Sequence, residues 1–229
     1  EFPKKILCGD IRMRYQADVD NFGANNYTII KGDIIISLPE LNDLDNDLTQ
    51  YNITDLTPLR SIEKIEGKLT IYNTDLTSLE EFHNLKSLGW QLRISRNPNL
   101  ENLQGLRNLE KLEVNEFSDD HRARLLIESN EAMATIDGLE KLTNIDVIKI
   151  GNNPSLLNLD GLSGLTTNSE FIGTQFLCGD NMYCGNENLF DFCELTNLFT
   201  NGTFNEVNLN GNAFTPSVSN IVNGNCSDD

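Results

Sequence analysis

The sequence predicts a mainly β, right-handed solenoid with coils of about 23 residues, parallel sheets and a short capping helix at each end. Two observations predict this fold. A strand motif, in which one residue separates two apolar residues, recurs at steps of 23, 33 and 23 residues. A ladder of apolar residues at every third position precedes each motif. Because one coil cannot bury its apolar face alone, such repetition is typical of stacked coils.

The strand motifs and their ladders define four regular coils. The motifs are Leu69-x-Ile71, Leu92-x-Ile94, Leu125-x-Ile127 and Ile148-x-Ile150. The ladder residues are Ile53, Leu56, Leu59, Ile62, Ile65, Leu76, Leu79, Phe82, Leu85, Leu88, Leu100, Leu103, Leu106, Leu109, Leu112, Met133, Ile136, Leu139, Leu142 and Ile145. A strict step of three does not fit an α-helix, which alternates steps of three and four. It fits short strands and 3₁₀-like turns bent around a coil.

We expect one domain over residues 1–229, with residues 1–31 as the N-terminal cap, 32–212 as the repeats and 213–229 as the C-terminal cap. Caps are needed because a terminal coil would otherwise expose its apolar cross-section.

Both caps are expected to contain a helix. In the first, residues 16–22 have helical spacing, and Gly23 suits the position after a helix end. In the second, Thr215 and Pro216 suit the start of a helix, and Gly224 suits its end.

The ends of the repeat are less regular than its middle. The first strand is expected at residues 34–36, after Gly32, and a long coil of 35 residues separates Ile34 from Leu69. After Ile150 the pattern weakens, and Phe171 is the expected start of the next strand. The last strand motif is Val207-x-Leu209.

The five cysteines point to an oxidising compartment. Their spacings match no zinc pattern, and four of them lie in the last 52 residues. Of the three possible pairings of these four, we favour Cys178–Cys184 and Cys193–Cys226. The remaining residue, Cys8, is either a free thiol or the partner of a cysteine outside this sequence.

Composition excludes some partners. The net charge is −18 and the pI is about 4.4, so phosphate backbones and anionic membranes are repelled. Nucleic acid is therefore not an expected partner. The sequence has no run of 18 apolar residues, so no membrane span is expected. No cofactor is expected either.

Two motifs and the termini carry a family resemblance. The segments Leu100–Leu109, with Gly105, and Ile136–Ile145, with Gly138, follow a Leu-x-x-Leu-x-Gly-Leu-x-x-Leu pattern that resembles the receptor L domain. The opening from Cys8 and the close up to Cys226 resemble bacterial secreted or surface-displayed versions. The resemblance implies a leucine-rich, β-helix-like solenoid without enzyme activity. It fixes no ligand residues.

Two sets of polar residues have structural explanations. Asn97, Asn130, Asn153 and Asn212 share one repeat position, with Thr74 there in the first regular coil; stacked Asn side chains satisfy turn backbone groups. Asp43, Asp45 and Asp47 alternate like the start of a calcium loop, but the required Gly and Glu do not follow. They are a weak metal candidate, and a solvated acidic loop is the alternative.

The step of 33 residues places about ten extra residues within 111–124. Insertions in repeat proteins map to loops, often on the binding face. Phe117, His121 and Arg122 are the candidate ligand-binding residues of this insertion. The alternative is a tolerated surface insertion.

The strand positions between the inward residues are the second candidate site, because alternate residues of a strand face opposite sides. These outward positions are Thr70, Tyr72, Arg93, Ser95, Leu126, Glu128, Lys149 and Gly151. Tyr72, Arg93, Glu128 and Lys149 are expected to line a shallow ligand platform, with an ordinary solvated sheet as the alternative. Trp90, the only tryptophan, has inward parity.

These features predict a non-enzymatic, extracellular or cell-surface recognition or adhesion module that binds a protein or a glycan. Only His83 and His121 are present, and no nucleophile motif accompanies them. A polysaccharide-active β-helix enzyme and a structural spacer are the alternatives.

Overall fold

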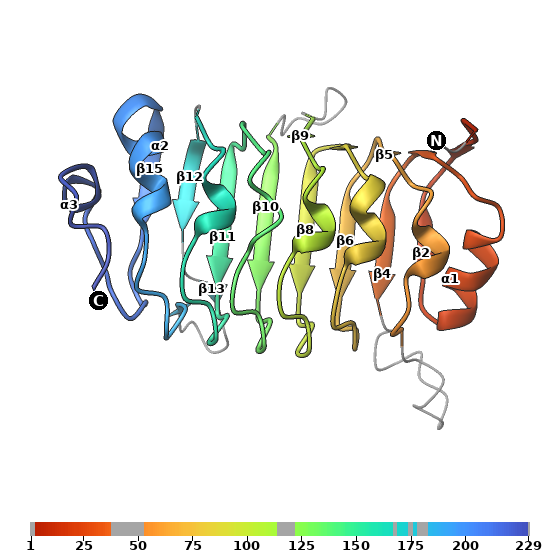
Figure 1. Ribbon diagram of the computed structural model, residues 1–229, viewed down its shortest axis with the longest axis horizontal. Helices are drawn as coiled ribbons and strands as arrows, with labels where there is room; N and C mark the ends of the chain where they lie inside the picture. The colour runs from red at the N-terminus through yellow and green to blue at the C-terminus, as the bar shows by residue number, and fades with distance from the viewer. Residues whose placement is uncertain are drawn as a thin grey trace.

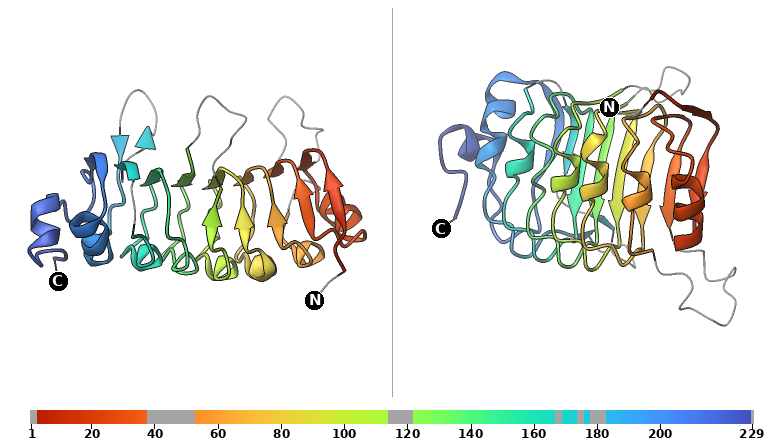
Figure 2. Two further views of the ribbon diagram at one scale, coloured as in Figure 1. Left: turned by 90° about the horizontal axis from the view of Figure 1, so that it is seen from above. Right: turned by 45° about the vertical axis from the view of Figure 1, so that its right-hand side comes forward.

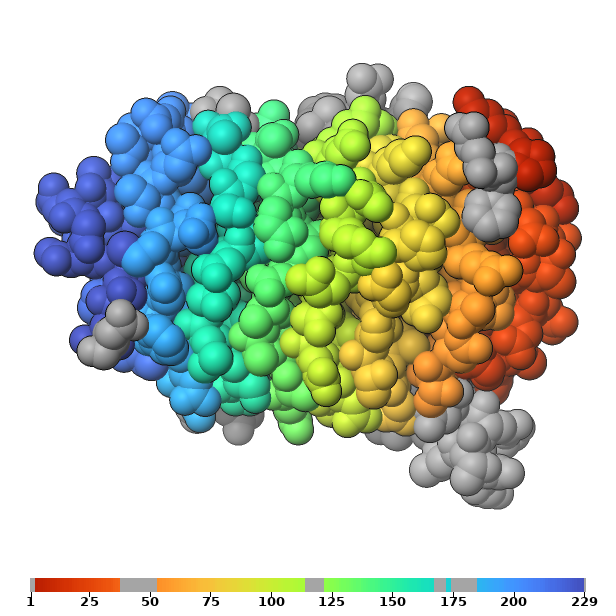
Figure 3. Space-filling model, viewed as in Figure 1, coloured from red at the N-terminus to blue at the C-terminus, as the bar shows by residue number. Residues whose placement is uncertain are grey.

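The chain is mainly β, with parallel sheets and few helices. The computed structural model describes residues 3–37, 53–113, 122–166, 169–173, 176–177 and 183–228. Successive coils lie side by side along the long axis, with the two termini at opposite ends (Figure 1). In the space-filling view the coils form adjacent bands in chain order (Figure 3).

Two parallel sheets run along the stack of coils. Over the described residues, the larger has eight strands in the order β15-β12-β11-β10-β8-β6-β4-β2, and the smaller has five in the order β1-β3-β5-β7-β9. The larger sheet comprises β2 (Ile11–Met13), β4 (Ile34–Ser37), β6 (Leu69–Tyr72), β8 (Gln91–Ser95), β10 (Arg124–Glu128), β11 (Val147–Gly151), β12 (Ser169–Gly173) and β15 (Phe204–Asn208). The smaller comprises β1 (Ile6–Cys8), β3 (Ile29–Lys31), β5 (Lys64–Ile65), β7 (Ser87–Leu88) and β9 (Lys111–Leu112). A separate antiparallel pair joins β13 (Phe176–Leu177) and β14 (Tyr183–Cys184).

Short helices line the side opposite the large sheet (Figure 2). Among the residues that the structure describes, the 3₁₀ helices are η3 (Thr57–Leu59), η4 (Glu80–Asn84), η5 (Gln104–Leu106), η6 (Asp160–Leu162) and η7 (Cys193–Leu195). The α-helices of the same described ranges are α1 (Gln16–Gly23), α2 (Thr196–Asn201) and α3 (Val218–Val222). The ladder step of three therefore corresponds to 3₁₀ turns, as predicted.

The strand register confirms the predicted repeat. Leu69 pairs with Leu92, Leu92 with Leu125, and Leu125 with Ile148. Every ladder residue is buried, with at most 5% of its surface exposed. The stacking stays in phase across the step of 33 residues, because β8 and β10 pair in register.

Glycine allows the coils to approach closely just before the large-sheet strands. A Cβ on Gly67 would lie 2.4 Å from the carbonyl oxygen of Gly32, and a Cβ on Gly32 would lie 2.4 Å from that of Gly9. Because real Cβ atoms do not approach so closely, this column must be glycine.

The N-terminal segment is itself a coil. The expected helix is present as α1, but β1 and β2 of the same segment also join the two sheets, with Ile6 paired to Ile29 and Ile11 to Ile34. Both pairs are 23 residues apart, so the repeat already begins there. The prediction that Gly23 follows the helix was wrong: Gly23 is its last residue, and a Cβ there would lie 2.1 Å from that of Pro58.

The repeat also persists beyond Ile150. Leu156, Leu159, Leu162 and Leu165 continue the ladder and are buried. The next strand begins earlier than expected, at Ser169 rather than Phe171. Phe171 pairs with Val147, and Ile172 takes the place of Ile148 in this coil.

At the C-terminus, the Cys193–Cys226 disulfide is confirmed, while Cys178 lies outside the described residues. The last helix begins later than predicted. Ser217, rather than Thr215, is its N-cap, because the Ser217 and Asn220 side chains form a reciprocal capping box. Gly224, at φ +87°, follows the helix as predicted.

Candidate functional site

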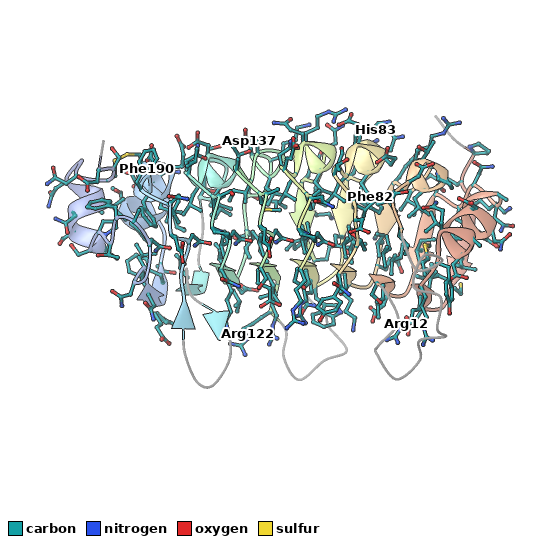
Figure 4. The ribbon with its side chains drawn as sticks, turned by 90° about the horizontal axis from the view of Figure 1, so that it is seen from below. Arg12, Phe82, His83, Arg122, Asp137 and Phe190 are labelled. Carbon is teal, nitrogen blue, oxygen red and sulfur yellow. A yellow bond between two sulfur atoms is a disulfide. The ribbon has the colours of Figure 1, made fainter. Side chains whose placement is uncertain are left out.

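The outward face of the large sheet gathers the predicted platform residues. Inward Leu92 and Ile94 are fully buried, while Arg93 between them is partly exposed. Tyr72, Glu128 and Lys149 are likewise partly exposed on neighbouring strands. Figure 4 shows the two sides of the coils: Arg12 and Arg122 lie on the large-sheet side, and His83 and Asp137 lie on the opposite side.

An open groove crosses the N-terminal half of this face. Its volume is about 290 Å³. Strands β2, β4, β6 and β8, with one residue just before β6, supply its lining: Arg12, Ile35, Ser37, Lys68, Thr70, Tyr72, Gln91 and Arg93. We call this the sheet groove. Two of the four predicted platform residues, Tyr72 and Arg93, line it.

Ion and ring contacts orient Tyr72 and Arg93. The guanidinium carbons of Arg93 and Arg96 lie 5.9 and 5.5 Å from the centre of the Tyr72 ring, within the range of a cation–π contact. Arg93 also forms an ion pair with Glu128 on β10. The Arg93 side chain is 40% exposed and that of Glu128 is 16% exposed. Arg93 is therefore accessible to a ligand, and its more buried partner Glu128 fixes its position through the ion pair.

Two outward positions are closed to a ligand. Ser95 and Gly151 are buried, although strand parity predicted that they face out. Ser95 lies between the much larger Tyr72 and Glu128 on the neighbouring strands. The Ser95 hydroxyl has no hydrogen-bond partner among the described residues.

The inward parity of Trp90 was wrong. Trp90 is partly exposed, and the Lys68 ammonium lies 5.7 Å from the centre of its ring. Strand β8 begins only at Gln91, so the alternation does not extend to Trp90. Lys68 also forms an ion pair with Asp33, at 3.2 Å. Trp90 thus flanks the sheet groove beside one of its cations.

Sequence reasoning missed four residues of this region: Arg12, Lys68, Arg96 and the exposed Trp90. A signal for Arg12 was present, since Ile11-x-Met13 precedes Ile34-x-Ile36 by 23 residues. A signal for Lys68 was its outward parity, two residues before Thr70.

The insertion is described only in part. Arg122 is partly buried and lies on the large-sheet side (Figure 4). Phe117 and His121 lie outside the described residues, as do Asp43, Asp45 and Asp47. Within the described ranges, no group of three or more His, Cys, Asp or Glu side chains is arranged to hold a metal ion.

The asparagine column has the predicted structural role. Asn130 Oδ1 accepts hydrogen bonds from the backbone N–H of Asn97 at 3.1 Å and from its side-chain amide at 3.2 Å. Asn153 Oδ1 accepts the same two hydrogen bonds from Asn130. The column continues through Asn186, which the sequence analysis missed, to Asn212. Because Asn97, Asn130, Asn153 and Asn186 are fully buried, they are unavailable to a ligand.

Acidic residues gather on the opposite side of the coils. Burial raises the pKa of Asp160, and the nearby charges of Glu194, Asp191, Asp137 and Glu140 raise it further. His83 is on this side too, where its Nδ1 lies 2.8 Å from the Glu80 carbonyl oxygen. Arg107 lowers the pKa of Glu80 through a side-chain hydrogen bond.

None of the helices in the described part of the chain has the length and apolar character needed to cross a membrane.

No curated protein matches the sequence. The model of one family, described as Receptor L domain, matches residues 26–91, less than a third of the chain. The match runs from just before β3 to the first residue of β8 and includes much of the sheet groove. Over residues 26–91 the match supports the predicted resemblance to the receptor L-domain family.

Proposed function

We propose that this chain is a non-enzymatic recognition or adhesion module that binds a protein or glycan on the outward face of its large sheet. The observation that carries the proposal is the sheet groove, in which Tyr72 and Arg93 are held by contacts from Arg96 and Glu128. Groups that are already fixed lose little conformational freedom on binding, so the site is preorganised.

The proposal includes the architecture that displays this face. Residues 1–229 form one right-handed solenoid, in which residues 1–31 serve as both the first coil and the N-terminal cap and residues 213–229 as the C-terminal cap. The parallel strand order and the 23-residue register steps support this interpretation. Phe117, His121 and Arg122 of the insertion extend the ligand surface, together with Glu128 and Lys149.

The proposed location is extracellular or at a cell surface. The Cys193–Cys226 disulfide supports it, because such bonds persist in oxidising compartments. The family match supports it as well, since receptor L domains are ligand-binding modules of receptors.

A binding panel tests the proposal. The wild-type chain is screened against glycans and extracellular proteins, and each glycan hit is assayed for release of reducing sugar. Binding without turnover is expected. Turnover would instead identify a polysaccharide-active enzyme, and the absence of any specific ligand would favour a spacer.

Matched variants locate the binding surface. Y72A/R93Q/E128Q removes one ring and one ion pair from the outward face, and H83A/R107Q/E80Q removes one ring and one ion pair from the opposite side. The first variant should weaken binding at least tenfold, and the second less than twofold. Equal effects would place the ligand elsewhere.

A further inference from the structure

We infer that the sheet groove binds a linear polysaccharide that carries carboxylate or sulfate groups. This inference rests on the proposed function and specifies the ligand of that site. It is carried by the juxtaposition of three cations, two aromatic rings and three neutral polar side chains across the strands β2 to β8.

The cations are spread over one face of the sheet, and Arg12, Lys68 and Arg93 all line the groove. Arg12 on β2 and Arg93 on β8 occupy one cross-strand row, three strand spacings apart. Neighbouring strands are about 4.8 Å apart, so these two cations stand at opposite sides of the groove. Lys68 lies two residues before Thr70 of that row, and Arg96 follows the end of β8. This clustering occurs in a chain whose net charge is −18.

These cations are available to a ligand. Arg12 is exposed and has no carboxylate partner within the part of the chain that the structure describes. The Lys68 and Arg93 side chains are 27% and 40% exposed despite their pairs with Asp33 and Glu128. Ion pairs that reach solvent contribute little to stability, so each cation can also engage a ligand anion at small cost.

The rest of the groove suits sugar rings. Ser37, Thr70 and Gln91 supply neutral hydrogen-bonding groups to pair with hydroxyls. Tyr72 lines the groove and Trp90 flanks it, and both combine an apolar ring with a polar edge.

Two observations favour a polysaccharide over other polyanions. Extended peptides commonly bind by adding a strand to a sheet edge, whereas this groove lies on the sheet face and β4, β6 and β8 are interior strands. Double-stranded DNA carries one charge per about 1.7 Å. A polysaccharide with a single carboxylate or sulfate on each ring has a lower charge density than this duplex, so the acidic remainder of the chain repels it less.

The single tryptophan gives a direct readout, because Trp90 lies beside Lys68. Polygalacturonate, sulfated dextran, neutral dextran and polyglutamate are titrated into the intact chain while its Trp90 emission is followed. One of the two charged polysaccharides should shift the emission at low salt, and the shift should weaken as salt is added. Which of them binds better identifies carboxylate or sulfate as the recognised group.

Charge-matched variants complete the test. R12Q/K68Q removes two groove charges, and K111Q/K141Q removes two charges from residues outside the groove. The first should lower affinity for the charged polysaccharide at least tenfold, and the second less than twofold. The inference is overturned by equal losses in both variants, by equal binding of neutral dextran, by tighter binding of polyglutamate, or by an unchanged wild-type emission.

Failure of this inference is distinguishable from failure of the proposed function. If Y72A/R93Q/E128Q loses an uncharged glycan or a protein ligand while no charged polysaccharide binds, the ligand class is wrong and the binding face stands.

Discussion

At the scale of single residues, the buried asparagines stabilise the stacked coils through backbone contacts. The Asn130 side chain donates to the carbonyl oxygens of Ile94 and Glu128 and accepts from the backbone N–H of Asn97. The same amide also donates to Asn153 Oδ1 in the next coil, so Asn130 joins three consecutive coils. Amide side chains do this because they donate and accept at once.

Replacing Asn130 by alanine should lower the free energy of unfolding by about 3 kcal/mol, since buried backbone groups lose their partners. Asn188→Ala is the control, because exposed Asn188 donates only one described hydrogen bond, to Pro154. It should cost less than about 1 kcal/mol. Urea denaturation measures both, and similar losses would show that the column is not a main source of stability.

Asp160 makes a pH-dependent contribution. Its pKa is raised in the folded chain, first by burial and then by neighbouring carboxylates. The folded chain therefore binds the proton of Asp160 more tightly than the unfolded chain does. As the pH rises through the folded pKa, ionisation of this buried carboxyl lowers the free energy of unfolding. Asp160→Asn should raise stability by less than about 1 kcal/mol at pH 7 and have no effect below the unfolded pKa near 3.8. A variant that is less stable at pH 7 contradicts this.

At the scale of elements, the C-terminal cap depends on one covalent link. The disulfide between Cys193 and Cys226 spans 33 residues and joins η7 to the segment after α3. Replacing both cysteines by serine should destabilise the cap by about 2–4 kcal/mol. Hydrogen exchange should accelerate in residues 189–226 and stay unchanged in β4 to β10. Uniform acceleration would show that the cap does not unfold separately.

The insertion after β9 should be dispensable for folding, because β8 and β10 pair in register across it. Replacing residues 114–121 with one glycine should keep the melting temperature within a few degrees, since each doubling of loop length costs only about 0.6 kcal/mol. Ligand affinity should fall if Phe117 and His121 contribute. A deletion variant that cannot fold would show that the segment belongs to the core.

The sequence predicted the core well and the site only partly. Ladder residues and strand motifs repeat a local pattern, so Leu92 and Leu125 could be aligned without knowing the structure. The lining of the sheet groove depends on where each strand begins. Because β8 begins at Gln91, the alternation of inward and outward residues could not be applied to Trp90. The step of 33 residues from Asn153 to Asn186 was not predicted, because the repeat pattern in the sequence is less regular after Ile150.

At the scale of the whole molecule, the chain separates two chemistries. Arg12, Lys68, Arg93 and Arg96 gather on the large-sheet face, and the carboxylates around Asp160 gather on the opposite side. This separation allows an acidic chain to keep one cationic surface. Stacked coils hold that surface rigidly, since each strand is paired on both sides except at the ends of the sheet.

Lysine footprinting of the wild-type chain tests the central claim most directly, because the lysines sample both sides. The chain is acylated with and without the ligand that binds best in the panel, and each lysine is quantified by mass spectrometry. The ligand is expected to protect Lys68 and Lys149 on the outward face and to leave the acylation of Lys86 and Lys141 unchanged. Protection of Lys86 and Lys141 with full labelling of Lys68 and Lys149 would contradict it.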